Sequence, residues 1–405
     1  MILAQSFIAR QPRSLLDDLN RESGRIYTLT MVEHWRIKNR KDIWLSQYGA
    51  MRVNDALAGE SILHAHSKDA AQEGFYKACK VSKALIAKGV DTKYPHKRKM
   101  FRTTAWKKKG IKVNSEHLLL SRAKGLKPIV VLIPEQLQGF SFDEVRLVYN
   151  QSSRRYYWHA TYDDGLEPEI PQGQEVVAVD LGEVHPAAVC SQKEAQVISC
   201  RELRSSIQGN NKMIAKITER QSKLTKRSRR WRKLQATKAK KLAQSKLKQR
   251  DICHKISRAI VDFAVEHKAS KIVIGDVRDV ANKVSLSKSS NQKISQWTHG
   301  IIQDYVAYKS AMKGIQVKLR DEAFTSQSCP CCGNRQKPKG RMYKCSKCGW
   351  QGHRDGQVGA PNILSLELFG ELSRVLVPSV KYRHPYLIHK GKRSQVDTLQ
   401  VAGNS

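Results

Sequence analysis

Two cysteine pairs near the C-terminal end of this 405-residue sequence constrain its fold more tightly than any other feature. Each pair reads Cys-x-x-Cys-Gly, and 12 residues separate the two pairs. The glycine tolerates the positive φ that a tight knuckle favours, and four thiolates close a tetrahedral Zn²⁺ site that leaves no position for water. We therefore predict a structural zinc ribbon with the ligands Cys329, Cys332, Cys345 and Cys348. Cys331 could replace Cys332, but only Cys332 keeps both the two-residue gap and the following glycine.

The charge balance is the second constraint, because 73 Lys and Arg against 36 Asp and Glu give a net charge of +37. Such an excess attracts phosphates strongly and indicates a polyanionic partner. Residues 212–250 hold sixteen of these cations and a single acid. Within them Ile217, Leu224 and Trp231 recur every seven residues, so we predict one basic helix over residues 205–250 with a thin buried stripe.

Two basic segments are predicted to contact nucleic acid. The first is the centre of the basic helix, with the residues Arg227, Arg229, Arg230, Arg232 and Lys233. In the second, Lys97–Lys109, cations alternate with aromatic residues, which suits phosphate contact combined with base stacking. Its candidate residues are Arg98, Lys99, Arg102 and Lys107. A solvated loop is the alternative for this second segment.

Membrane insertion and export are not expected from the sequence. No run approaches the roughly 18 apolar residues that cross a bilayer, and Met1–Ala9 lacks the basic and long apolar regions of a signal peptide. We therefore expect a cytoplasmic protein that has no membrane partner and lies near the nucleoid through bound nucleic acid.

The order of predicted elements indicates a multidomain α+β protein. Helical periodicity comes first, short strands with polar turns follow, and an α/β alternation with a mixed sheet begins after a Pro- and acid-rich link. The predicted layout is a first strand (1–12), a helical lobe (13–92), a β-rich domain (93–172), an α/β domain in two parts (173–323 and 353–375) around the cysteine ribbon (324–352), and a basic flexible tail (376–405).

Two aspartates are candidates for metal-dependent phosphodiester cleavage. Two Mg²⁺ ions about 3.5–4 Å apart need carboxylates that converge, as they do at the C-terminal ends of neighbouring strands. Asp180 ends the buried strand Glu175–Asp180, and Asp355 precedes the helix-like run Ala360–Leu368. Each alone is weak, since an aspartate after a strand is often only a cap. Combined with the basic helix, they favour a nuclease.

From Glu175 to Leu364 the chain resembles the TnpB proteins of insertion sequences, relatives of the miniature type V CRISPR effectors. The resemblance rests on the arginine-rich helix, the run Phe324–Cys329, the paired cysteines and the ending from Arg354-Asp355 to Asn362-Ile363. It implies an RNase H-like (RuvC) nuclease domain split by the basic helix and the zinc ribbon. The N-terminal half is similar to the family only in layout, as a β-rich wedge domain with an inserted helical recognition lobe.

The function that this resemblance implies is that of an RNA-guided DNA endonuclease. A guide RNA from the transposon end would pair with double-stranded target DNA, beside a short adjacent motif that the protein reads. Two hypotheses from other classes stay open. One is a nuclease-dead, RNA-guided DNA-binding repressor, and the other is a zinc-ribbon DNA-binding protein that uses no guide RNA.

The chain departs from the family pattern at Gly275, where many members carry a metal-binding glutamate. Asp276 is a poor replacement, because a one-residue shift along a strand points a side chain to the opposite face. Glu322 follows the next strand, and a subset of the family, including eukaryotic Fanzor relatives, looks to have relocated its glutamate in this way. The resemblance thus implies that Asp180, Glu322 and Asp355 hold two Mg²⁺ ions.

A smaller departure lies between the last aspartate and the asparagine of the family pattern. Asp355 and Asn362 are separated by one residue more than is usual in the family. We therefore predict an irregular start to the last helix.

Overall fold

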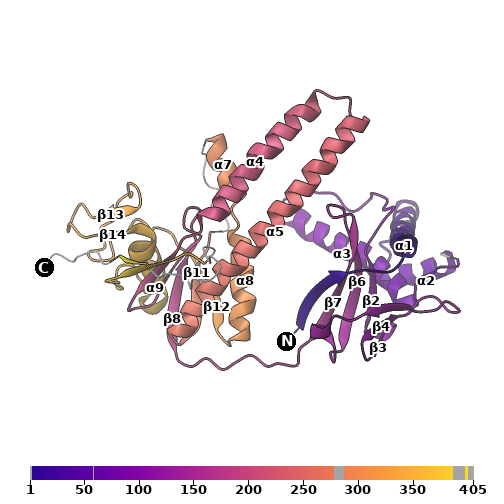
Figure 1. The fold of residues 1–405 in the computed structure, drawn as a ribbon, viewed down its shortest axis with the longest axis horizontal. Helices are drawn as coiled ribbons and strands as arrows, with labels where there is room; N and C mark the ends of the chain where they lie inside the picture. Colours follow the sequence, from indigo (N-terminus) through magenta and orange to yellow (C-terminus); the bar gives the residue numbers. More distant parts are fainter. Residues whose placement is uncertain (1, 58, 278–286, 386–396, 400–405) are drawn as a thin grey trace. The chain divides into compact units, whose positions relative to one another are not determined.

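The computed structural model describes residues 2–57, 59–277, 287–385 and 397–399 (Figure 1). The described chain forms two compact units, Met1–Leu166 and Glu167–Ser405. In the first unit the helices are α1 (Arg13–Lys41), α2 (Gln47–Leu57) and α3 (Ala65–Ala87). Its strands are β1 (Ile2–Ile8), β2 (Thr104–Lys107), β3 (Ile111–Asn114), β4 (His117–Leu120), β5 (Ile129–Leu132), β6 (Phe142–Asn150) and β7 (Arg155–Asp163).

The first unit packs its helices beside two small antiparallel sheets, in the orders β1-β7-β6-β2 and β3-β4-β5. β6 and β7 form a hairpin, since they pair directly across their turn. Trp106 and Trp158 are fully buried between the strands, with their rings 5.7 Å apart. Their indole N–H groups donate to the Ser121 carbonyl and the Gln11 side chain, so both large residues are buried without an unsatisfied donor.

The second unit is built on a seven-stranded mixed sheet in the order β12-β11-β8-β9-β10-β15-β16. Its strands are β8 (Glu175–Asp180), β9 (Ala187–Cys190), β10 (Ala195–Ile198), β11 (Ala269–Gly275), β12 (Gln316–Arg320), β15 (Val380–Arg383) and β16 (Asp397–Leu399). β11 runs parallel to both β8 and β12, so the ends of these three strands lie at one edge. The mixed sheet and the predicted strand Glu175–Asp180 are confirmed.

Helices cover both faces of this sheet, and side-chain alternation along the strands decides which residues they meet. Val177 and Val179 of β8 pack with α5 (Arg229–Glu266) and α8 (His299–Met312) in one core. Ala178 points the other way and packs with α9 (Ala360–Phe369). Asp180 has the same parity as Ala178, so the strand directs its carboxylate to the α9 face.

The prediction of one basic helix over residues 205–250 is wrong. The segment is a hairpin of two helices, α4 (Arg201–Ser222) and α5 (Figure 1). The chain reverses because Arg227 adopts a left-handed φ of 70° and Ser228 caps α5 by accepting from the Trp231 backbone N–H. Leu224 therefore lies in the turn and belongs to no helical stripe. After the turn α5 runs unbroken for 38 residues, well beyond the predicted end at residue 250.

Part of the predicted flexible tail lies in the sheet instead. β15 pairs in parallel with β10, and the Arg383 guanidinium donates to the Asp262 carboxylate at 3.0 Å. Burial of Val380 in the α9-facing core gives this strand a reason to pair there. The rest of the predicted tail, residues 386–396 and 400–405, lies outside the described residues. Among the residues that are described, no helix is long and apolar enough to cross a membrane.

Candidate active site and cysteine cluster

Three carboxylates meet at the edge where β8, β11 and β12 end. Asp180 is the last residue of β8, Glu322 lies two residues beyond β12, and Asp355 lies in the turn that leads into α9. Burial, and then the charges of Glu322 and Asp355, raise the pKa of Asp180 well above its usual range. Arg354 and Arg341 oppose this shift only in part. The structure thus brings the three predicted site residues into electrostatic contact.

Glu322 occupies the space beside Gly275 that a side chain at position 275 would fill. A Cβ on Gly275 would lie 2.2 Å from Glu322 Oε2, which is far too close. This Oε2 atom is buried and has no hydrogen-bond partner among the described residues. Burial and the neighbouring charges of Asp276 and Asp321 raise the pKa of Glu322 to about 7. Glycine at 275 and the carboxylate of Glu322 are therefore sterically matched.

Side-chain alternation along β11 places Gly275 and Asp276 on opposite sides of the strand. Val273 packs in the α9-facing core, and Gly275 shares its parity. Ile274 packs in the opposite core with α5 and α8, and the Asp276 charge acts on His299 of α8. The side of the strand that carries Gly275 is therefore the side of the carboxylate edge.

Asp355 lies in a π-helical turn, Arg354–Gly359, which runs directly into α9. This turn accommodates the extra residue, so the predicted irregular helix start is confirmed. Gly359 is required there, because a Cβ at that position would lie 2.1 Å from Asp180 Oδ2. Buried Asn362 then ties α9 down by donating at 2.8 Å to the carbonyls of Thr325 and Ser328.

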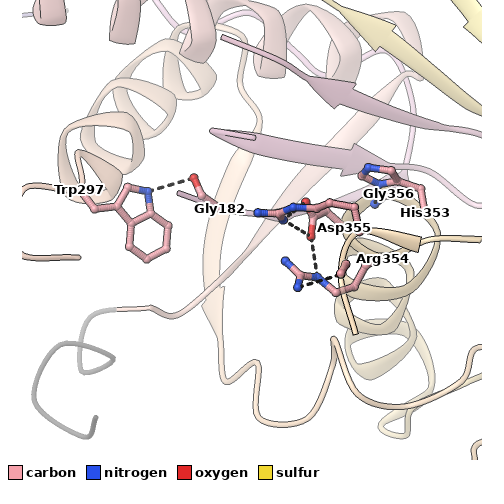
Figure 2. A network of polar contacts seen from close by, with 8 residues as sticks. Gly182, Trp297, His353, Arg354, Asp355 and Gly356 are labelled. Carbon is pink, nitrogen blue, oxygen red and sulfur yellow. Dashed lines mark hydrogen bonds and ion pairs between the residues drawn. The ribbon is translucent and has the colours of Figure 1, made fainter. Parts of the chain in front are cut away.

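Two arginines that the sequence reasoning missed hold Asp355 in place. Arg341 Nη1 contacts both carboxylate oxygens, at 3.2 and 2.8 Å, and Arg354 Nε donates to Oδ1 at 3.1 Å (Figure 2). His353 also lies here, and its Nδ1 accepts from the Gly356 backbone N–H at 3.1 Å. Arg341 comes from the loop between the cysteine pairs, where the only signal in the sequence is a general excess of cations.

The carboxylate edge fits divalent cations of the hard, oxygen-preferring kind. Its donor atoms are carboxylate oxygens, which are the ligands that Mg²⁺ takes in proteins. A cation bound at this edge would give the Glu322 Oε2 atom a partner. It would also offset the repulsion between carboxylates that raises the pKa of Asp180. Ligand atoms of His185, His353 and Asp355 also lie within 4.8 Å of one another. Imidazole, however, favours softer metals than Mg²⁺.

The four predicted cysteines converge on a second candidate metal centre. Their sulfur atoms all lie within 4.8 Å of one another, with 3.7 Å between Cys329 and Cys348 and 3.6 Å between Cys332 and Cys345. A zinc tetrahedron with Zn–S bonds of about 2.3 Å has edges of about 3.8 Å, so the cluster fits Zn²⁺. Cys332 lies in the cluster, whereas Cys331 is exposed and outside it, which favours the choice of Cys332.

Turn geometry explains why these cysteines converge. Gly333 and Gly349 have φ of 72° and 73°, as predicted for the residue after each pair, and their N–H groups donate to the carbonyls of Cys329 and Cys345. The strands β13 (Met342–Lys344) and β14 (Gln351–His353) frame the second pair. Although desolvation opposes it, hydrogen bonds from the backbone amides of Cys348 and Lys347 lower the pKa of the Cys345 thiol to about 6. Burial raises the pKa of the Cys329 thiol to about 12, and the pKa of the Cys332 thiol is raised as well. The backbone amides thus favour the thiolate, the form that binds metal, at Cys345.

The predicted nucleic-acid residues fall into two groups. One group is exposed, at the α4–α5 turn and on the loop before β2: Arg227, Arg229, Arg230, Arg232, Lys233, Arg98 and Lys99. The other is engaged by the protein itself. The Arg102 guanidinium stacks over Tyr27 at 5.0 Å, and burial lowers its pKa, while Lys107 pairs with Glu73. Arg102 and Lys107 are therefore less available to a phosphate than the sequence suggests.

The fold and the carboxylate edge define a class, multidomain α/β proteins with carboxylates gathered at the end of a mixed sheet. The solved structure of a Cas12f1–guide RNA–target DNA complex shares this fold, with a TM-score of 0.60 over 83% of this chain and 80% of that chain at 14% identity. Residues 154–281 match the family model described as "Probable transposase" (OrfB_IS605), and residues 299–363 match "Cas12f1-like, TNB domain". These matches support the TnpB family for this chain.

Curated relatives agree with this assignment. A TnpB-like protein of Methanocaldococcus jannaschii is 25% identical over 45% of this chain and 66% of its own length. The endodeoxyribonuclease Cas12f1 of Sulfoacidibacillus thermotolerans is 29% identical over 27% of this chain and 26% of its own. A candidate RNA-guided DNA endonuclease of Escherichia coli, InsQ, is 29% identical over 53% and 55%. The chain thus spans less than two thirds of each of these relatives.

Proposed function

We propose that this protein is an RNA-guided DNA endonuclease of an insertion sequence. The observation that carries the proposal is the meeting of Asp180, Glu322 and Asp355 at one sheet edge, with a buried carboxylate oxygen that lacks a hydrogen-bond partner. The names of the relatives support a guide RNA and a DNA substrate. The net charge of +37 is in keeping with binding two nucleic acids at once.

The proposed chemistry is phosphodiester hydrolysis in an RNase H-like (RuvC) domain. Two Mg²⁺ ions, when bound, would activate water and stabilise the leaving oxygen. Asp180 and Glu322 would hold them from β8 and from the segment after β12, with Glu322 acting in place of the usual glutamate at 275. Asp355 would complete the triad, while Arg341 and Arg354 fix the orientation of its carboxylate.

The remaining parts of the chain receive supporting roles in this proposal. The cysteine cluster would hold a structural Zn²⁺ and form a ribbon inserted between the two parts of the nuclease domain. The first unit would be a wedge domain with a helical recognition lobe, which reads a short motif next to the target. A guide RNA from the transposon end would lie on the exposed cations of the α4–α5 turn, and the protein would act in the cytoplasm on nucleoid DNA.

The decisive experiment is cleavage of matching DNA by the protein purified with its native RNA. We expect cutting in Mg²⁺, none in EDTA, and loss of cutting in Glu322→Gln, where the carboxylate becomes an amide of the same size. Glu266→Gln is the matched control, because Glu266 is exposed at the end of α5, away from the β8–β12 edge. Normal cutting by Glu322→Gln would contradict the relocated glutamate.

The same preparation tests the other two hypotheses. Sequence-specific DNA binding that needs the RNA but gives no cutting would assign the protein to the guided repressors. Binding without any co-purified RNA, seen as no nuclease-sensitive absorbance at 260 nm, would assign it to the zinc-ribbon DNA-binding proteins.

A further inference from the structure

A cavity of about 320 Å³ opens within the second unit, on the α5 and α8 side of the sheet. Its walls come from the loop after β8, from α4, from α7 (Lys288–Ser295) and from the start of α8. Leu203, Ile207 and Ile302 supply apolar lining, and the indole of Trp297 supplies an aromatic wall. The volume lies at the lower end of the range for small-ligand sites, so it admits a group of about the size of one heteroaromatic ring system.

The cavity adjoins the segment that follows β8, the strand that ends in Asp180. The Trp297 indole N–H donates to the Gly182 carbonyl at 3.1 Å, only two residues after Asp180 (Figure 2). The lining residues Leu203, Trp297 and Ile302 pack in the core on the α5 and α8 face of the sheet, whereas Asp180 points to the α9 face. A ligand in the cavity therefore lies at the end of β8 that carries Asp180, on the other face of the sheet.

The polar groups of the cavity match the hydrogen-bonding edge of a nucleobase. Gln208 of α4 and Gln292 of α7 line it with side-chain amides, the group that pairs with adenine and other base edges. Thr298, also part of the lining, is only 7% exposed, and within the described part of the chain its Oγ1 has no conventional hydrogen-bond partner. The Cys253 thiol beside it is a weak partner. A buried hydroxyl in this state is stabilised by a polar ligand.

The charge at the mouth of the cavity suits a nucleic-acid strand. Lys212 and Lys293 are exposed at its rim. Glu183 is the one acid of the lining, and its carboxylate is paired with Arg204 at 3.1 Å. The rim thus attracts phosphates on either side of a base that enters the cavity.

We propose that this cavity binds one unpaired nucleobase of the DNA strand that reaches the carboxylates over the end of β8. This inference rests on the proposed nuclease function and names the form of its substrate. A paired and stacked base cannot enter, so the strand must be single-stranded at this point. The aromatic wall stacks with the base, the two glutamine amides contact its edge, and the lysines hold the neighbouring phosphates.

Photocrosslinking tests the proposal without any cutting. The full-length protein is mixed in EDTA with a short single-stranded DNA that carries one 5-iodouracil, irradiated, and mapped by mass spectrometry. We expect crosslinks to concentrate on Trp297. In the double variant Gln208→Ala, Gln292→Ala they should weaken about tenfold, the effect of losing one good base contact. Gln192→Ala, an exposed glutamine of the β9–β10 turn, should crosslink as the wild type does.

The outcomes separate this inference from the nuclease function itself. Normal cutting without Trp297 crosslinks, or crosslinks that the double variant does not weaken, would overturn the base pocket and leave the nuclease intact. Crosslinks at Trp297 in a protein that never cuts would support the pocket and contradict the nuclease. Crosslinking to RNA of the same sequence but not to DNA would overturn the assignment to the DNA strand.

Discussion

The cysteine cluster and the carboxylate cluster are two candidate metal centres of opposite construction. The four cysteines come from a span of 20 residues, and local turns bring their sulfurs together. The three carboxylates come from residues 175 positions apart (355 − 180), and only the sheet and α9 bring them together. At the first centre backbone amides favour the thiolate of Cys345, whereas at the second burial and mutual repulsion disfavour the charged form of Asp180. The cysteine centre is built locally, from ligands that are close in sequence, and a metal bound there would stabilise the fold. The carboxylate centre is built globally, from residues far apart in sequence, and it forms only when the sheet and α9 are folded.

The largest expected effect is on the globally built centre. Asp180→Asn removes a central carboxylate while keeping its shape, so the rate of DNA cleavage should fall at least about a thousandfold. The same variant should unfold at a higher urea concentration in EDTA, because it removes a buried, repelled charge. Gel-based cleavage and urea titration measure the two effects. Asp251→Asn, at an exposed site on α5, should change neither.

Breaking the locally built centre should have a large but differently distributed effect. Cys345→Ser should abolish zinc binding, measured by metal analysis, and should reduce cleavage about a hundredfold through Arg341, which the ribbon loop carries to Asp355. The sheet of the second unit should still unfold cooperatively, since its core does not include the cysteine cluster. Cys331→Ser should keep about one zinc per chain. Loss of zinc in Cys331→Ser would contradict the assigned ligands.

A medium effect is expected from a single methyl group at the carboxylate edge. In Gly275→Ala the new Cβ would lie 2.2 Å from Glu322 Oε2, so that carboxylate must move. Displacement of a catalytic group on this scale lowers the rate about ten- to a hundredfold. We expect a higher Mg²⁺ requirement as well, measured by metal titration of the cleavage rate. Gly300→Ala is the control, because a Cβ there meets no other atom. Equal rates in both variants would show that Glu322 does not depend on the glycine.

The smallest effect is a pH dependence of the metal-free protein. The pKa of Glu322 is raised to about 7 from 4.5, so its contribution to the free energy of unfolding is full below about pH 4.5 and is lost as the pH rises through 7. In EDTA, Glu322→Gln should therefore gain little stability at pH 5 and more at pH 8, as measured by urea unfolding. Glu266→Gln should show no such difference. An equal gain at both pH values would mean that Glu322 is not protonated in the folded protein.

The same contrast explains what the sequence could predict. The convergence of the four cysteines, the positive φ of Gly333 and Gly349, and the strand ending in Asp180 depend on short motifs, and the structure shows all three. The proximity of Glu322 to Gly275 could be anticipated only because strand alternation excludes Asp276. The role of Arg341 could not be anticipated, since nothing in its local sequence distinguishes it from the other cations of its loop.

Two other features of the structure could not be predicted, because they depend on backbone conformation and strand pairing that the periodicity does not show. The break between α4 and α5 depends on a left-handed residue, Arg227, and on the Ser228 cap, and a seven-residue recurrence of apolar residues concealed both. Strand β15 pairs with β10, which lies almost 200 residues earlier in the chain, so its place could not be read from periodicity. Sequence patterns describe each element, while the pairing partners are set by the assembled sheet.

The unbroken helix α5 has a mechanical consequence. At 1.5 Å per residue its 38 residues form a rod of about 57 Å. Its first half carries exposed cations, and the part from Ile252 to Phe263 packs against one face of the sheet (Figure 1). A stiff rod anchored at one end acts as a lever, so a load applied at the α4–α5 turn is transmitted as torque to the face of the sheet opposite the carboxylates.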